Sequence, residues 1–456
     1  MSAPASPSAS EVRPGQTPTR LPASDVSSMV GILGLAGLLS WIAFCRYWPE
    51  IAGAVGVPGV HIRLSGPKAA LFGLVMSALP MVIWSVFVDK VHLRASTGLD
   101  WSLRKTRSRD SQTTRTKIIG LWVTWAVIGG LYVMGRWYWQ GGYGFALTVI
   151  GYAIIPAALL SIPYVRWIDG VMVNPRDHSW HFGALLLRQE GWEWDEVKKH
   201  WRSWIIKGFF TAFMLSIVPA GFAYVVNADL QTILNNPAIV GILLIELLFV
   251  IDVQIGTVGY VLTNRPLDAH IRSGNPFLGG WVAAMICYPP LVWGIIGNGM
   301  VLGYENQTRD WTYWLAGNEI LLWGWAAWLV LLTAIYAAAT VVFGMRFSNL
   351  TYRGVITHGP FKYTRHPAYL SKNIFWWCSV MPFLVTSDSM ADAVRNVFAL
   401  LCVNAIYYWR AKTEEAHLLA EDPKYREYHA WMEENGVITA PLDRLGKRLM
   451  LLFSQT

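Results

Sequence analysis

Long apolar runs recur along most of this chain, and their length limits the folds that it can adopt. A helix needs about 20 residues to cross the hydrocarbon core of a bilayer, and runs of that length fill much of the 456-residue sequence. Charged residues make up only 14% of the chain, whereas a soluble domain carries roughly a quarter. The runs do not alternate in polarity as transmembrane β-strands do. The sequence therefore predicts an all-α, polytopic transmembrane helical bundle.

We predict ten membrane spans within this bundle. Pro289 and Pro290 interrupt the seventh span, and the ninth span is short enough to be tilted or re-entrant. Glu246 and Asp252 fall inside the sixth span, where acidic residues are costly, and we expect them to form a structural pair or to line a lipid cavity. The predicted spans are residues 29–45, 69–88, 118–135, 144–164, 205–226, 238–262, 277–302, 318–344, 373–387 and 391–409.

Lysine and arginine are distributed very unevenly between the two sides of these spans. With a cytoplasmic N-terminus, 30 of the 37 Lys and Arg residues fall in cytoplasmic segments and 5 on the opposite side. Positive residues concentrate on the cytoplasmic side, so we predict that both termini are cytoplasmic. The net charge of +8 then reflects orientation and contact with anionic headgroups rather than nucleic-acid binding, which would need a basic soluble domain. Short loops and the lack of a recognisable processing signal favour a bacterial inner membrane.

Composition and spans together divide the chain into three regions. Residues 1–27 are rich in Pro, Ser and Ala and have no apolar stretch, so we expect a disordered cytoplasmic tail. Residues 28–344 are predicted to form a scaffold of eight transmembrane spans. Residues 345–456 are predicted to contain a transmembrane hairpin and a C-terminal cytosolic helix, and their motifs, described below, mark them as the catalytic region.

The cysteines and histidines do not indicate a metal or redox centre. Four cysteines lie in apolar runs with no zinc or redox spacing, and we predict that they are packing residues. His178 and His181 would lie one helical turn apart if that segment is helical, but no second pair of ligands accompanies them. We therefore predict no metal site.

Two polar motifs flank the last predicted hairpin. The first is "GPFKYTRHPAYLSKN" at residues 359–373, and the second is "RAKTEEAHL", which begins at Arg410. Because a crossing and its return end at one membrane face, the motifs can lie side by side although 45 positions separate Tyr369 from Glu414. Adjacent carboxylates repel each other unless they are paired, and Arg365 and Arg410 are available partners. One acid can then hold an arginine while the other faces a cationic ligand.

The residue types in these motifs suit such a ligand. Glu414 and Glu415 point about 100° apart on a helix, and a cation is favoured over the face of an aromatic ring. Pro367 keeps His366 out of helical geometry, which fits a connection just before a helix. Interfacial aromatic and basic residues usually anchor a protein in the membrane, but two such motifs separated by one hairpin favour a binding site. The candidate rings are Tyr363, Tyr369, Tyr407 and Tyr408.

The C-terminal motifs resemble a known signature. A run "GPFKYTRHPAYLS", a hairpin and then "EEAHLLAEDPKYREYHAWM" look like isoprenylcysteine carboxyl methyltransferases and the related phospholipid N-methyltransferases. The resemblance covers residues 345–441, about a fifth of the chain. Here Ser371 replaces a common glycine, and Lys372, unusual at this position, is expected to extend toward the headgroups. The resemblance implies cofactor binding by Arg365, His366, Pro367, Tyr369, Glu414 and Glu415, to which the aromatic pattern adds Tyr363.

The resemblance implies an integral membrane methyltransferase that uses S-adenosyl-L-methionine on a lipid, prenylated or otherwise lipid-linked acceptor. Transfer of a methyl group is an in-line displacement, so the protein mainly supplies alignment and exclusion of water. We predict Arg365 and His366 as the catalytic residues. Arg365 would orient the cofactor carboxylate or an anionic acceptor with its fork of donors, and His366 would accept a proton from an amine acceptor.

The acceptor and two other functions stay open at this stage. A carboxylate, a phosphate and an amine are all compatible with the motifs. The first alternative function is a sterol-reductase-like, NADPH-dependent membrane oxidoreductase, whose motif resembles "RHxNY" where this chain has "RHPAY". The second is a non-enzymatic lipid-binding or transport module.

Overall fold

The computed structural model describes residues 20–106, 110–135, 142–297 and 299–454. Among these residues, eight helices are long and apolar enough to cross a membrane. The chain is therefore a multi-pass helical membrane protein, as predicted. The eight are α1 (Ser28–Arg46), α3 with the π-helical turn that follows it (Pro67–Val88), α5 (Ser111–Gly135), α6 (Gly142–Asp169), α8 (Trp194–Asn227), α10 (Pro237–Val261), α14 (Glu319–Val341) and α16 (Met390–Glu421).

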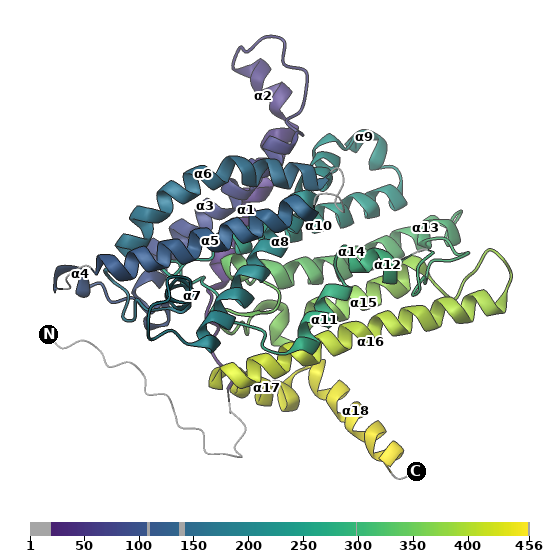
Figure 1. Cartoon of the computed structure of the whole chain (residues 1–456). Helices are drawn as coiled ribbons and strands as arrows, with labels where there is room; N and C mark the ends of the chain where they lie inside the picture. Colours follow the sequence, from purple (N-terminus) through teal and green to yellow (C-terminus); the bar gives the residue numbers. More distant parts are fainter. Residues whose placement is uncertain (1–19, 107–109, 136–141, 298, 455–456) are drawn as a thin grey trace.

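Shorter elements connect and cover these helices (Figure 1). The two short strands pair in antiparallel fashion, with Ser273 opposite Tyr352, and this pairing joins the segment after α10 to the segment after α14. The shorter elements are α2 (Trp48–Ala54), η2 (Val91–Leu93), η3 (Ala95–Thr97), α4 (Leu103–Thr106), α7 (His178–Leu186), α9 (Leu230–Ile233), β1 (Ser273–Gly274), α11 (Leu278–Ile286), α12 (Leu291–Ile295), α13 (Trp311–Trp314), η4 (Gly344–Arg346), β2 (Thr351–Tyr352), η5 (Gly359–Lys362), α15 (Pro367–Val380), α17 (Pro423–Asn435) and α18 (Thr439–Ser454).

Two of the ten predicted spans are not long continuous helices. The predicted seventh span is divided into α11 and α12 at Pro289 and Pro290, because proline has no amide hydrogen to donate and its ring collides with the preceding turn. Position 298 of that span lies outside the described residues. The predicted ninth span corresponds to α15, whose 14 residues are fewer than a perpendicular crossing needs. Figure 1 shows α15 between α14 and α16.

Helix α10 lies at the centre of the bundle. It is apolar almost all round, as expected for a helix that is covered on several sides, and it packs against α3, α8 and α14. Asp252 of α10 accepts a hydrogen bond from Thr340 of α14. A Cβ added at Gly259 would collide with the carbonyl oxygen of Phe347. Glycine at this position therefore allows the segment after α14, which leads into the C-terminal region, to pack directly on α10.

The N-terminal segment contacts the C-terminal region. Of the tail expected over residues 1–27, the first 19 positions lie outside the described residues, and the last eight make defined contacts. The amide of Asp25 donates to the Val355 carbonyl over 2.9 Å, and its carboxylate lies 2.5 Å from Lys424 Nζ. The His358 ring lies 2.9 Å from the Ser24 hydroxyl. These contacts place residues 20–27 at the same end of the bundle as α17.

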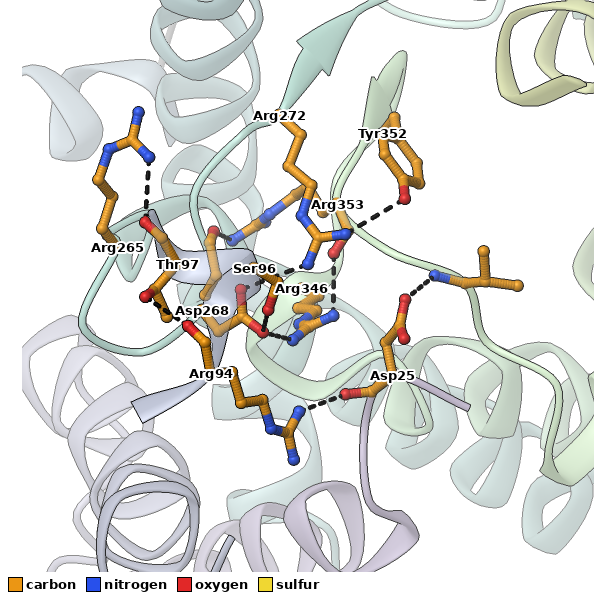
Figure 2. A network of polar contacts seen from close by, with 12 residues as sticks. Asp25, Arg94, Ser96, Thr97, Arg265, Asp268, Arg272, Arg346, Tyr352 and Arg353 are labelled. Carbon is orange, nitrogen blue, oxygen red and sulfur yellow. Dashed lines mark hydrogen bonds and ion pairs between the residues drawn. The ribbon is translucent and has the colours of Figure 1, made fainter. Parts of the chain in front are cut away.

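A buried network of arginines and acids joins several segments at this end of the bundle (Figure 2). Asp268 is only 1% exposed, and its carboxylate lies 2.6 Å from Arg346 and 3.3 Å from Arg272. Arg353 donates to the backbone carbonyls at positions 259, 269, 345 and 347. The network connects the N-terminal segment, the loop before α4 and the segments that follow α10 and α14. The lysine and arginine count assigns all of these segments to one side of the membrane, and the structure brings them together.

We predict that Asp268→Asn destabilises the fold strongly. The substitution leaves the buried Arg346 without its acid, and removal of one partner of a buried ion pair costs about 3–5 kcal/mol. The midpoint of thermal unfolding in detergent measures the effect. Asp195→Asn is the control, because it removes an acid from a pair in which the Asp195 side chain is 84% exposed, and such pairs contribute little. Equal midpoints for the two variants would contradict the assigned role of Asp268.

Candidate active site

The first motif folds into the start of α15. Pro367 occupies the first helical position, where the missing amide hydrogen would have had no partner within the helix. His366 precedes it with φ −130° and ψ 59°, outside helical geometry. Arg365 and His366 are therefore held on a connection before the helix, while Tyr369 lies on its first turn. This arrangement lets all three side chains extend toward α16.

The second motif lies near the end of α16, and the hairpin brings it against the first, as predicted. Glu415 is 4% exposed, and its Oε1 atom lies 2.9 Å from both Arg365 Nε and His366 Nε2. Lys412 Nζ lies 2.8 Å from the other Glu415 oxygen. His429 Nε2 lies 3.8 Å from that same oxygen, so four cationic or protonatable groups surround this one carboxylate and offset the cost of burying it.

Glu414 faces a different set of partners. Its Oε1 atom accepts a hydrogen bond from the Tyr369 hydroxyl over 2.5 Å and lies 3.3 Å from Arg410 Nε. Arg410 also stacks over the rings of Tyr288 and Tyr369 at 5.4 and 5.1 Å, and donates to Asn349 over 2.6 Å. The two adjacent acids point to different partners, as the helical geometry predicts, but each is paired with an arginine, whereas the sequence predicts an arginine for only one of them.

Arg365 has a second acidic partner that the sequence did not indicate. Its Nη2 atom lies 3.0 Å from Asp443 of α18, the helix that extends away from the bundle in Figure 1. The Nε and Nη1 atoms are buried and neither makes a hydrogen bond among the described residues, although Nε lies within ion-pair distance of Glu415. A buried donor without a partner costs about 1–3 kcal/mol. Arg365 therefore has bonding capacity that a ligand can use.

A cavity of about 200 Å³ lies between these groups. Of the predicted site residues, Glu415 does not line the cavity. It contacts Arg365 and His366, which do. Tyr363 and Tyr408 are also absent from the lining, and they are 51% and 61% exposed. The predicted residues that do line the cavity are Arg365, His366, Pro367, Tyr369, Tyr407 and Glu414.

Several lining residues come from outside the two motifs. Tyr336, Ala339 and Thr340 belong to α14, so the cavity crosses the boundary that the sequence places at residue 345. These residues lie in helices and loops far from the motifs in the sequence, and nothing in their local pattern marks them. The other lining residues outside the motifs are Tyr288, Phe343, Arg346, Phe347, Ser348, Asn349, Leu350, Thr351, Arg353, Gly354, Val355 and Ile356, together with Tyr425 and Tyr428 of the longer C-terminal signature. Within the motifs, Phe361, Ala368, Lys372, Arg410, His417 and Leu418 also line the cavity.

Lys372 points inward rather than toward the headgroups. Its Nζ atom lies 5.2–5.6 Å from the ring centroids of Tyr336, Trp376 and Tyr407, and the residue lines the cavity. The sequence expectation for this lysine is therefore wrong. The physical reason is that three aromatic faces attract its charge within the protein.

The lining carries more positive than negative groups. Five cationic side chains and one carboxylate, that of Glu414, line the cavity in the described part of the chain. Arg346 is paired with Asp268, and Arg353 is bound by backbone carbonyls. Burial and the neighbouring Arg346 lower the pKa of Arg353, but the side chain stays charged at neutral pH. Burial also raises the pKa of Tyr425 and Tyr428, so both phenols stay neutral.

The C-terminal part of the chain matches a known protein family. Residues 322–420 match the isoprenylcysteine carboxyl methyltransferase (ICMT) family. This match confirms the resemblance of the C-terminal motifs and suggests a membrane methyltransferase. It begins in α14 and ends one residue before the end of α16, so it includes the first motif and the paired acids. In the comparisons with curated proteins and with solved structures, nothing matched the chain.

We predict that Glu415→Gln destabilises the protein by about 3 kcal/mol, because the buried Arg365 then keeps only one acidic partner. The matched control is Lys412→Gln, which removes a partner whose side chain is 43% exposed and should have little effect. Thermal unfolding in detergent distinguishes the two. A Glu415→Gln protein as stable as Lys412→Gln would show that the buried carboxylate does not hold this end of α16.

Proposed function

We propose that this protein is an integral membrane methyltransferase that uses S-adenosyl-L-methionine to methylate a lipid or lipid-linked acceptor. The observation that carries the proposal is the cavity between the two motifs, which Glu414 and Arg365, with its unsatisfied donor, both line. The family match covers the same elements. When bound, the cofactor supplies an electrophilic methyl group.

The groups that line the cavity fit the parts of this cofactor. A sulfonium cation suits the carboxylate of Glu414 and the faces of Tyr369 and Tyr407. A carboxylate, as in the amino acid part of the cofactor, suits Arg365 Nη1, because it would satisfy a buried donor. The aromatic lining suits the adenine ring. We therefore assign cofactor binding to Arg365, His366, Pro367, Tyr369 and Glu414, with Glu415 holding Arg365 and His366 in position.

His366 is suited to accept a proton if the acceptor is an amine. Its Nε2 atom faces the Glu415 carboxylate at 2.9 Å, and a carboxylate accepts hydrogen bonds. This contact makes Nε2 the donor and leaves Nδ1 as the basic nitrogen. An acceptor carboxylate or phosphate is already anionic and would need no base, and Lys372 would then help to attract it.

The surroundings of the cavity favour an acceptor from the bilayer. Its walls include α14 and α16, both long enough to span a membrane, together with α15. An acceptor with an apolar chain could reach the cavity along these helices, and a soluble cofactor could reach it from the end where the loops meet. We propose that this end is cytoplasmic, on the strength of the lysine and arginine distribution.

We predict that the purified protein binds S-adenosyl-L-methionine saturably and that Glu414→Gln weakens binding at least tenfold. The expected loss is about 1.4 kcal/mol or more, because the variant removes the lining carboxylate. Glu421→Gln at the exposed end of α16 is the matched control. Isothermal titration in detergent measures affinity, with NADPH titrated in parallel. Binding of NADPH alone would favour the reductase alternative, and binding of neither would favour a non-enzymatic module.

We also predict that Arg365→Lys lowers methyl transfer by about 100-fold. Lysine keeps the charge but loses the planar fork, which makes charge-assisted hydrogen bonds in two directions. Transfer of labelled methyl groups into a lipid extract measures the activity, and Arg426→Lys on α17 is the control. Full activity in Arg365→Lys would remove the bidentate role assigned to this residue.

A further inference from the structure

A second cavity lies away from the candidate active site and shares no lining residue with it. It has a volume of about 460 Å³ and is formed mainly by α5, α6 and α8, with Thr263, Asn264, Arg265 and His270 after α10 completing its lining. These helices lie on the side of the bundle away from α15 and α16 in Figure 1. The family match does not extend to this part of the chain.

One end of this second cavity is cationic. Lys207 of α8 lies 4.5 Å over the Trp204 ring, and no carboxylate pairs with it in the described part of the chain. Arg265 donates one hydrogen bond, to the Thr97 carbonyl over 3.1 Å, and Figure 2 shows it at the edge of the arginine network with this single contact. Both side chains therefore keep donors that are free to bind an anion.

Lys117, the third cation of the lining, is already paired with Asp177, the lining carboxylate. Lys117 Nζ lies 2.6 Å from Asp169 and 3.2 Å from Asp177. Asp177 also accepts hydrogen bonds from the amides of Ser179 and Trp180, because it caps α7. Arg265 lies near enough to Asp177 to interact with it electrostatically. Asp169 and Asp177 are thus already paired, whereas Lys207 and some of the Arg265 donors are not.

Two buried polar atoms in the same cavity have no partner. Thr263 Oγ1 and His270 Nδ1 are both enclosed and lack a hydrogen bond among the residues that the structure describes. Buried polar atoms in proteins are nearly always satisfied. Two unsatisfied polar side chains and two cations with unused donors thus line one cavity, a combination that suits a polar, anionic group.

The other wall of the cavity is apolar and open toward the bilayer. Leu121 and Trp125 of α5 face Ala157 and Leu160 of α6, and Leu160 is 66% exposed. Each of these helices is long and apolar enough to span a membrane. Lys117 lies near the start of α5, so the cationic end is the end assigned to the cytoplasmic side. The cavity thus combines an anion-binding end with an apolar channel that runs along two spans.

We propose that this cavity binds an anionic phospholipid of the cytoplasmic leaflet. The lipid phosphate lies between Lys207 and Arg265, and an acyl chain lies along Leu121, Ala157 and Leu160. A zwitterionic lipid adds a cation for which the site has no free acid, because Asp177 is already bound by Lys117. Free phosphate leaves the apolar wall uncovered. The proposal concerns the scaffold and does not depend on the proposed methyl transfer.

The test compares lipids on the full-length protein. Native mass spectrometry of the detergent-purified chain, titrated with phosphatidylglycerol or phosphatidylcholine of equal chain length, gives the two affinities. We expect tighter binding of phosphatidylglycerol, and a loss of about fivefold for each of Lys207→Gln and Arg265→Gln, the usual effect of one basic residue at an anionic surface. Lys198→Gln removes an exposed charge from the same helix and should bind as the unmodified protein does.

Two further variants separate charge, shape and folding. Lys207→Arg keeps the charge and should keep the preference for phosphatidylglycerol. Ala157→Trp keeps every charge but fills the apolar wall, and should weaken phosphatidylglycerol binding at an unchanged melting temperature. Inorganic phosphate at equal concentration should not displace the lipid. Equal affinity for the two lipids, a Lys207→Gln protein that binds like Lys198→Gln, or displacement by phosphate would each overturn the proposal.

Discussion

The structure of the C-terminal region depends on the buried carboxylate of Glu415. It draws Arg365 and His366 from the start of α15 and Lys412 from its own helix onto one group, at a place where an unpaired charge would be costly. Its neighbour Glu414, which is paired with Arg410 and Tyr369, is the acid that lines the cavity. One ion-pair cluster thus joins the start of α15 to the end of α16.

A second cluster of buried charges holds the surrounding loops in place. Asp268 and the arginines around it connect the N-terminal segment, the segment after α10 and the segment after α14, and the last of these forms one wall of the cavity. The helices of the bundle alone would not fix these loops. The scaffold therefore contributes to the candidate site directly, through Tyr288 and Tyr336, and indirectly, through this network.

Hydropathy and motif order predicted a large part of this arrangement. Eight of the predicted spans correspond to long apolar helices, and the hairpin places Tyr369 against Glu414, because a crossing and its return end at one face. The inward direction of Lys372 and the contact of Asp443 with Arg365 were not predictable. Both depend on which side chains surround them after folding: three aromatic rings for the lysine, and the path of the chain after α17 for the aspartate. The residues adjacent to Lys372 and Asp443 in the sequence do not determine either environment.

The central claim is that a sulfonium cofactor binds between the start of α15 and the end of α16. Hydrogen–deuterium exchange of the detergent-purified protein, with and without S-adenosyl-L-methionine, tests it most directly. The account predicts slower exchange in both segments, residues 363–370 and 410–418, and no change around the second cavity on α5 and α6. Saturating cofactor that leaves both segments unprotected, or that protects only a distant region, would contradict it.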